Sequence, residues 1–125
     1  MPEARLVDTG AGLMPQGEGW FVLNVADGVW FRNEHFGARV SFEPNGRVVK
    51  AFPELEEQEF PELGFTVFVL PPGKPSTMYH AETGQEDFLV LQGECLLIVE
   101  GEERRLRAWD FLHCQPGTHH VRRGG

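Results

Sequence analysis

Glycine and proline punctuate this chain along its length, and short runs rich in valine, phenylalanine, isoleucine and leucine lie between them. The 15 glycines and 9 prolines make up 24 of the 125 residues. These two residue types are the poorest helix formers, so a bundle of long helices is disfavoured. Hydrophobic residues account for 41% of the chain, which is enough for a packed core and argues against disorder.

The apolar runs have the length and residue types of β-strands. We expect strands at Trp20–Val25, Val29–Phe31, Ala38–Phe42, Arg47–Ala51, Phe65–Leu70, Met78–His80, Glu86–Gln92, Glu94–Glu100, Glu102–Leu106, Asp110–Cys114 and His119–Arg122. Turn residues separate them at Pro44-Asn45-Gly46, and hairpin turns are expected at Gln92-Gly93 and Glu100-Gly101. Many short strands separated by such turns predict an all-β sandwich or barrel.

The first 18 residues differ from the rest, because they contain glycine, proline and small polar residues and show no sustained period of apolar residues. We expect an extended N-terminal arm over 1–18 and one β-barrel domain over 19–125. The strand Glu86–Gln92 carries large apolar side chains on both faces, so a second layer should cover each side. That strand and the arm both need a covering surface, which predicts a homodimer.

Charge and cysteine content limit the kinds of binding partner and the cellular compartment that we expect for this chain. The formal net charge is −8, which argues against nucleic-acid binding, and the acidic run between Pro53 and Gly64 is interpreted as a solvated surface segment. No apolar run approaches the ~20 residues of a membrane span, and the first residues lack the apolar core of a signal peptide. With only Cys95 and Cys114, reduced thiols and a cytoplasmic location are expected.

Possible metal ligands gather in the second half of the chain. His80 and Glu82 are two residues apart at a strand end, so their side chains share a face. A turn over residues 83–85 would return Glu86 alongside them, and a type II turn over residues 115–118 leads to His119 and His120. Imidazoles and carboxylates together suit one divalent ion such as Fe, Mn, Ni or Zn, with coordination positions left open for water or substrate.

The same residues resemble the two motifs of the cupin family. Gly73, His80, Glu82 and Glu86, followed by Gly93, are similar to the first motif, G-x(5)-H-x-H-x(3,4)-E-x(6)-G, and residues 110–120 are similar to the second. The resemblance implies a single-domain, jelly-roll β-barrel. It also implies that the metal ligands are His80, Glu82, Glu86 and His120.

The sequence departs from the cupin pattern at several places. The first loop is one residue longer, and Glu82 stands where the family usually has its second histidine. Trp109 and Gln115 replace the usual glycine and proline of the second motif. The chain also stops at Gly125, before the strands that normally follow, so either the domain is shortened or the protein continues.

Other residues near the motifs have two interpretations each. His113 shares a face with Trp109, and it is either a catalytic or ligand residue or a hydrogen-bonded strand histidine. Tyr79, Phe88 and Trp109 are candidate substrate contacts or packing residues. His119 alternates with His120 and is expected to face outward.

Two functions remain open from the sequence. One is an enzyme, a dioxygenase or isomerase with a mononuclear metal centre that acts on a small organic molecule. The other is a non-catalytic cupin that binds a metal or a small ligand, as a sensor or storage module. The fold alone does not separate these two functions, and the substrate is not indicated.

Overall fold

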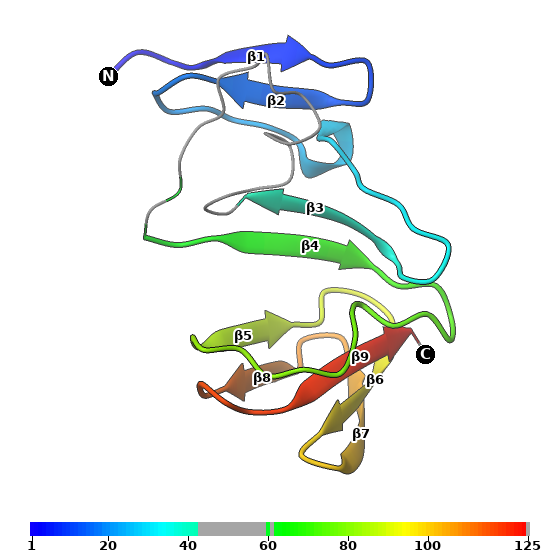
Figure 1. Cartoon of the computed structure of the whole chain (residues 1–125). Coiled ribbons are helices and arrows are strands. Elements are labelled where there is room, and N and C mark those ends of the chain that lie inside the picture. Colours follow the sequence, from blue (N-terminus) through cyan, green and yellow to red (C-terminus); the bar gives the residue numbers. More distant parts are fainter. Residues whose placement is uncertain (43–59, 61, 125) are drawn as a thin grey trace. The chain divides into compact units, whose positions relative to one another are not determined.

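The computed structural model describes residues 1–42, 60 and 62–124. The strand expected at Arg47–Ala51, the turn Pro44-Asn45-Gly46 and most of the acidic run lie outside the described residues. Contacts divide the chain into two compact units, shown in Figure 1. The first contains Met1–Arg32 and Ala38–Phe68, and the second contains Asn33–Gly37 and Val69–Gly125. No helix of the described residues is long and apolar enough to cross a membrane.

The first unit begins with a hairpin of two antiparallel strands, β1 (Arg5–Asp8) and β2 (Leu13–Gln16). Side chains close its turn, since Asp8 Oδ1 accepts a hydrogen bond from the Gly10 N–H and Thr9 Oγ1 accepts one from the Ala11 N–H. Because residues 5–8 pair with residues 13–16, the expected extended arm is not confirmed.

The rest of the first unit contains a strand pair and a short 3₁₀ helix. β3 (Ala38–Phe42) pairs with β4 (Phe65–Val69), close to the predicted bounds. The strand expected at Trp20–Val25 is wrong, because η1 (Val25–Asp27) begins there and Asn24 caps it by accepting a hydrogen bond from the Ala26 N–H. The strand expected at Val29–Phe31 is reduced to a single bridge at Phe31.

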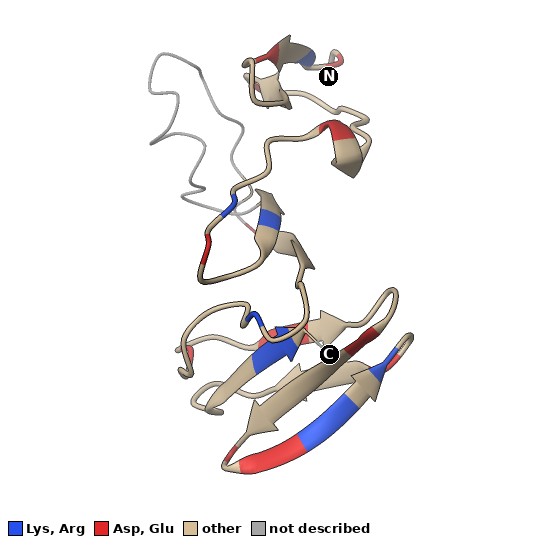
Figure 2. Ribbon diagram, turned by 90° about the vertical axis from the view of Figure 1, so that its right-hand side faces the viewer, with Lys and Arg blue, Asp and Glu red and all other residues tan. Residues whose placement is uncertain are grey.

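The second unit contains two small antiparallel sheets. Their strands are β5 (Glu86–Leu89), β6 (Glu94–Val99), β7 (Glu102–Arg107), β8 (Phe111–Cys114) and β9 (His120–Gly124). β5 pairs with β8, whereas β6 lies between β7 and β9. β7 is an edge strand whose glutamates and arginines are mostly exposed, and such charges discourage pairing with another chain (Figure 2).

The two predicted hairpin turns have different outcomes. Glu100 and Gly101 have φ values of 47° and 78° and connect β6 to β7, so this two-residue hairpin is confirmed. Gly93 also has a positive φ of 76°, but the strands on either side of it belong to different sheets. The hairpin predicted at Gln92-Gly93 is therefore wrong, because this turn carries the chain from one sheet to the other.

Phe88 joins the two sheets of the second unit. Its ring centroid on β5 lies 5.4 Å from that of His120 on β9, and the Arg122 guanidinium lies 3.6 Å above the same ring. Leu97 and Cys114 are almost fully buried in this unit. The all-β class is thus confirmed, whereas closure into a jelly-roll barrel is not observed among the described residues, whose strands form separate sheets.

Candidate metal centre

Two histidines far apart in sequence meet at an isolated β-bridge. The His120 N–H donates to the His80 carbonyl at 2.8 Å, and the His80 N–H donates to the His120 carbonyl at 3.2 Å. Directly opposed residues place their side chains on one face, and the two ring centroids are 4.9 Å apart. The predicted strand Met78–His80 is thus reduced to a single bridge at His80. Its partner is His120 of β9, whereas the sequence predicted that the strand beginning at Glu86 would lie alongside it.

The turn over residues 115–118 leads the chain into β9. The Thr118 N–H donates to the Gln115 carbonyl at 3.1 Å, and Gly117 has a φ of 86°. These features confirm the predicted type II turn, in which glycine adopts the left-handed conformation. The Gly117 N–H also donates to the Glu82 carbonyl at 2.9 Å, which connects the two motifs through the backbone.

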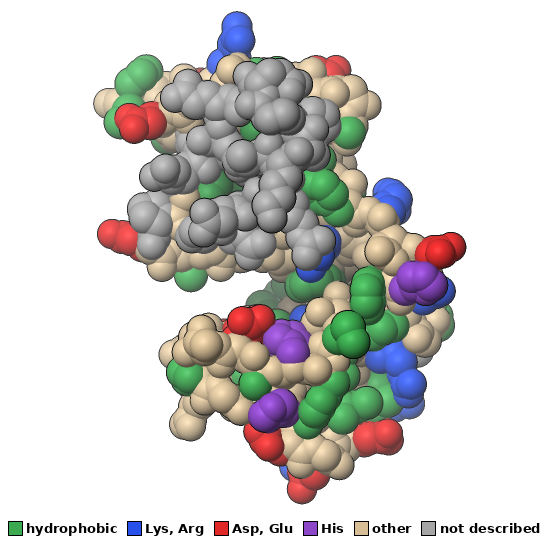
Figure 3. Space-filling model, in the orientation of Figure 1, with side chains coloured by type: hydrophobic (Ala, Val, Ile, Leu, Met, Phe, Trp, Pro, Cys, Tyr) green, Lys and Arg blue, Asp and Glu red, His purple; other side chains and the backbone are tan. Residues whose placement is uncertain are grey.

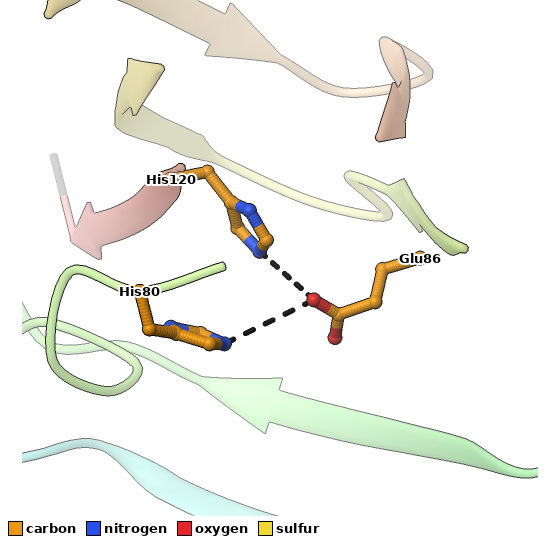
Figure 4. A group of neighbouring side chains, drawn as sticks. All are labelled: His80, Glu86 and His120. Carbon is orange, nitrogen blue, oxygen red and sulfur yellow. Dashed lines mark ion pairs between the residues drawn. The ribbon is translucent and has the colours of Figure 1, made fainter. Parts of the chain in front are cut away.

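Glu86 brings a carboxylate to the two imidazoles. Its position at the start of β5, opposite Cys114 on β8, is set by the antiparallel register of these strands. Glu86 Oε1 lies 3.0 Å from His120 Nε2 and 3.9 Å from His80 Nε2, as Figure 4 shows. One potential ligand atom from each residue falls within 4.8 Å of the others, which is a spacing that one ion can bridge.

The backbone sets the orientation of both imidazoles. His80 Nδ1 lies 2.7 Å from the Met78 carbonyl oxygen, and His120 Nδ1 lies 2.9 Å from the Thr118 carbonyl oxygen. A carbonyl oxygen only accepts, so each Nδ1 carries the proton and donates it. In a neutral imidazole the lone pair is then on Nε2, which is the atom that faces Glu86. A hydrogen bond from the other ring nitrogen is the usual outer support of a metal-binding histidine.

The innermost polar atoms of this cluster need positive charge between them, from a proton on His120 Nε2 or from a bound cation. His120 is 1% exposed, and neither its Nε2 nor Glu86 Oε1 makes a hydrogen bond, although the two atoms are only 3.0 Å apart. A lone pair against a carboxylate oxygen, away from water, is unfavourable unless positive charge lies between them. Two imidazoles and a carboxylate are a donor set that binds first-row divalent metals, so the residues fit such an ion.

Glu82 lies beside this cluster and not inside it. Its Oε1 is 3.0 Å from His80 Nε2, but it is not a member of the group of three whose ligand atoms converge. Its side chain is about half exposed, at 49%. Glu82, the fourth predicted ligand, therefore contacts His80 at the solvent-exposed side of the cluster.

Arg122 is a site residue that the sequence analysis missed. It is 7% exposed, it lies over the Phe88 ring, and its Nη2 donates to Ser76 Oγ at 3.0 Å. Burial lowers the pKa of its guanidinium to about 10, whereas the negative charge of Glu86 acts to raise it. Arg122 is two residues after His120 on β9, so strand alternation placed both on one face.

The predicted accessory residues lie in different places. His113 is on the opposite side of the β5–β8 pair from Glu86, because its cross-strand partner is Asp87, and His113 Nδ1 contacts Asp87 Oδ1 at 2.6 Å. Tyr79 stacks on the exposed His119, with ring centroids 5.9 Å apart. Figure 3 shows histidine side chains at the surface of the second unit.

Of the three predicted aromatic contacts, only Phe88 touches the cluster, through the ring of His120. Trp109 is 74% exposed and has a φ of 72°, in the turn between β7 and β8. Cys114 is a buried free thiol, as expected. Its burial, and then the nearby charge of Glu86, raise the pKa of this thiol, which makes it a poor nucleophile.

The family comparison agrees with this architecture. The sequence model of the Cupin domain matches residues 66–122, a segment that includes His80, Glu82, Glu86 and His120. This match over residues 66–122 supports a relationship of that segment to the cupin superfamily. No curated protein matches the chain.

Proposed function

We propose that His80, Glu86 and His120 bind one divalent metal ion, and that the protein is a small cupin whose metal centre acts on a small organic molecule. The observation that carries this proposal is that two buried atoms, His120 Nε2 and Glu86 Oε1, lie 3.0 Å apart and neither makes a hydrogen bond. Fe, Mn, Ni and Zn all accept this donor set. An oxygenase or isomerase reaction is the activity class we assign.

Each protein residue has a separate task in this proposal. The bound ion supplies Lewis-acid chemistry at its open coordination positions. Phe88 packs on the His120 ring and excludes water from the inner side of the cluster. Glu82, half exposed beside His80, is available as a fourth ligand or as a proton acceptor at the outer side.

Metal analysis tests the site directly. We expect the purified chain, loaded with a divalent metal and desalted, to retain about one equivalent, and the His120→Ala variant to retain almost none. His35→Ala is the matched control, because His35 is exposed and lies outside the cluster. Equal metal retention by the wild type and His120→Ala, or no retention by the wild type, would contradict the proposal.

A non-catalytic binding module is the second candidate, and one observation favours it. His113, the acid–base candidate, lies on the opposite side of the β5–β8 pair from Glu86. Oxygen uptake by the Fe(II)-loaded protein, measured across a panel of small organic acids, phenols and thiols, separates the two. Uptake that depends on one compound class and is lost in Glu86→Gln supports the enzyme, whereas tight ligand binding without turnover supports the binding module.

We also propose that the protein is a homodimer through the outer face of the β5–β8 pair. Leu89 and Phe111 are cross-strand partners on this face and are 49% and 65% exposed. A second copy that buried this apolar surface would remove it from water. Light scattering after size exclusion is expected to give twice the 14.1 kDa chain mass for the wild type, and the monomer mass for Phe111→Asp. A monomeric wild type at high concentration would contradict the dimer.

A further inference from the structure

Arg122 places a buried positive charge close to the proposed metal ligands. Its guanidinium lies 3.6 Å above the Phe88 ring, and the other ring contact of Phe88 is with His120, at 5.4 Å between centroids. Arg122 therefore lies one side chain away from the cluster, on the same face of β9 as His120. The Ser76 hydroxyl accepts a hydrogen bond from Nη2 and holds the guanidinium in this position. Arginine keeps its charge at neutral pH.

The charges around the cluster can be added residue by residue. A metal ion binds histidine in its neutral form, so in the metal-loaded cluster the charged groups are the ion, Glu86 and, beside them, Arg122. With a divalent ion these charges add to about +2, or to about +1 when Glu82 is included. Farther along the same sheet, Glu102 and Arg104 of β7 lie 4.0 Å apart and offset each other.

A net positive charge in a half-buried site is unfavourable unless an anion accompanies it. We infer that the metal-loaded site takes a small anionic ligand, such as a carboxylate, and that Arg122 is the residue that sets this preference. The inference rests on the proposed metal site and adds the class of its ligand. Arg122 acts through its charge and through the position of Phe88.

The charge of Arg122 has opposite effects on the metal and on the anion. A cation repels the incoming metal ion and attracts the anion that follows it. Removing this charge should therefore tighten metal binding and weaken anion binding. A purely structural role for Arg122 would weaken both, because loss of packing around Phe88 and His120 would disturb the whole cluster.

The experiment uses the full chain loaded with Co(II), whose visible absorption reports changes in coordination. Acetate and its neutral isostere acetamide are titrated separately. We expect acetate to bind the wild type at least about tenfold more tightly than acetamide. Arg122→Met, which keeps a long apolar side chain over Phe88, should lose most of this ratio and bind Co(II) more tightly in competition with a chelator.

Two further variants serve as controls. Arg122→Lys keeps the charge and should keep much of the acetate preference. Arg105→Met removes a charge from an exposed position on β7, 63% accessible, and should change neither affinity. If Arg122→Met fails to fold, as judged by circular dichroism, the acetate-to-acetamide ratio of the wild type decides the anion preference, and loss of that ratio in Arg122→Lys would contradict the role given to the charge of Arg122.

The possible failures are distinguishable. If the wild type does not bind Co(II), the proposed metal site is wrong and the anion preference falls with it. If Co(II) binds but acetate is no better than acetamide, the anion inference is wrong and the metal site stands. If Arg122→Met weakens metal and acetate binding together, Arg122 has only a structural role and its assignment as the specificity residue is wrong.

Discussion

Single residues show how the backbone orients the two histidine rings of the cluster. In both histidines, Nδ1 donates to the carbonyl oxygen two residues earlier in the chain, that of Met78 for His80 and that of Thr118 for His120. The same local hydrogen bond therefore places a proton on Nδ1 of both rings and turns Nε2 of each ring toward a carboxylate, that of Glu86 for His120 and those of Glu82 and Glu86 for His80. Because these hydrogen bonds are local, the orientation of each ring depends little on the packing of distant segments.

A second, solvent-exposed group allows a direct test of local electrostatics. The hydrogen bond from Gln85 Nε2, and then the contact with His113, lower the pKa of the Asp87 carboxyl below its usual 3.8. We expect carboxyl NMR titration to find this lowered pKa in the wild type and a higher pKa in Gln85→Ala. An Asp87 pKa unchanged by Gln85→Ala would contradict the assignment of Gln85 as the main cause.

The sign of the pH dependence follows from the direction of that shift. A carboxyl whose pKa is lower in the folded state stabilises the fold above its unfolded pKa, and this contribution is lost as the pH falls through the folded value. The destabilisation caused by Asp87→Asn is therefore expected to be full at neutral pH and to vanish in strong acid. Denaturant unfolding of the wild type and of Asp87→Asn, carried out from neutral to strongly acidic pH, measures this destabilisation.

At the scale of elements, the turn over residues 115–118 connects strand geometry to the site. Gly117 supplies the left-handed conformation of the turn, and its N–H bonds the Glu82 carbonyl. The turn thus sets both the start of β9, where His120 lies, and the backbone of the first motif. A change in the conformation of this turn should therefore shift both His120 and the backbone around Glu82.

Replacing Gly117 with alanine should strain this turn. A Cβ there meets nothing within 4 Å, so the cost comes from the φ of 86° and not from a clash. We expect Gly117→Ala to lower the free energy of unfolding by about 1–2 kcal/mol and to weaken metal binding. Gly84→Ala is the matched control, since Gly84 also has open space and lacks a positive φ. Equal effects of the two substitutions on unfolding in denaturant would contradict this explanation.

At the scale of the whole molecule, all the cluster residues belong to the second unit, Asn33–Gly37 with Val69–Gly125. A ligand that binds only the folded state stabilises it by about 2.7 kcal/mol at a hundredfold excess over its dissociation constant. We expect added metal to slow amide hydrogen exchange in β5, β8 and β9, and His120→Ala to abolish this effect. Protection that appears equally in the metal-treated His120→Ala variant would show that the ion acts elsewhere.

Local pattern predicted much of this molecule. The strands from β3 to β9 lie near the expected positions, because alternating apolar residues and glycine turns are encoded within a few positions of sequence. Motif spacing also predicted that His80, Glu86 and His120 would meet. The hairpin of β1 and β2 was missed, because its short strands have no apolar period and its turn is closed by the side chains of Asp8 and Thr9.

Strand pairing and burial were decided only by the tertiary structure. Sequence cannot show that Gly93 leads to another sheet, or that His80 pairs with His120, because these partners are chosen by contacts between distant segments. The same reason applies to Arg122, whose charge matters only because Phe88 from the facing sheet covers it. The sequence by itself determined most of the β-strands and the three residues that meet, because these are encoded by local pattern and motif spacing, whereas long-range packing decided how the strands pair and which charge lies beside the cluster.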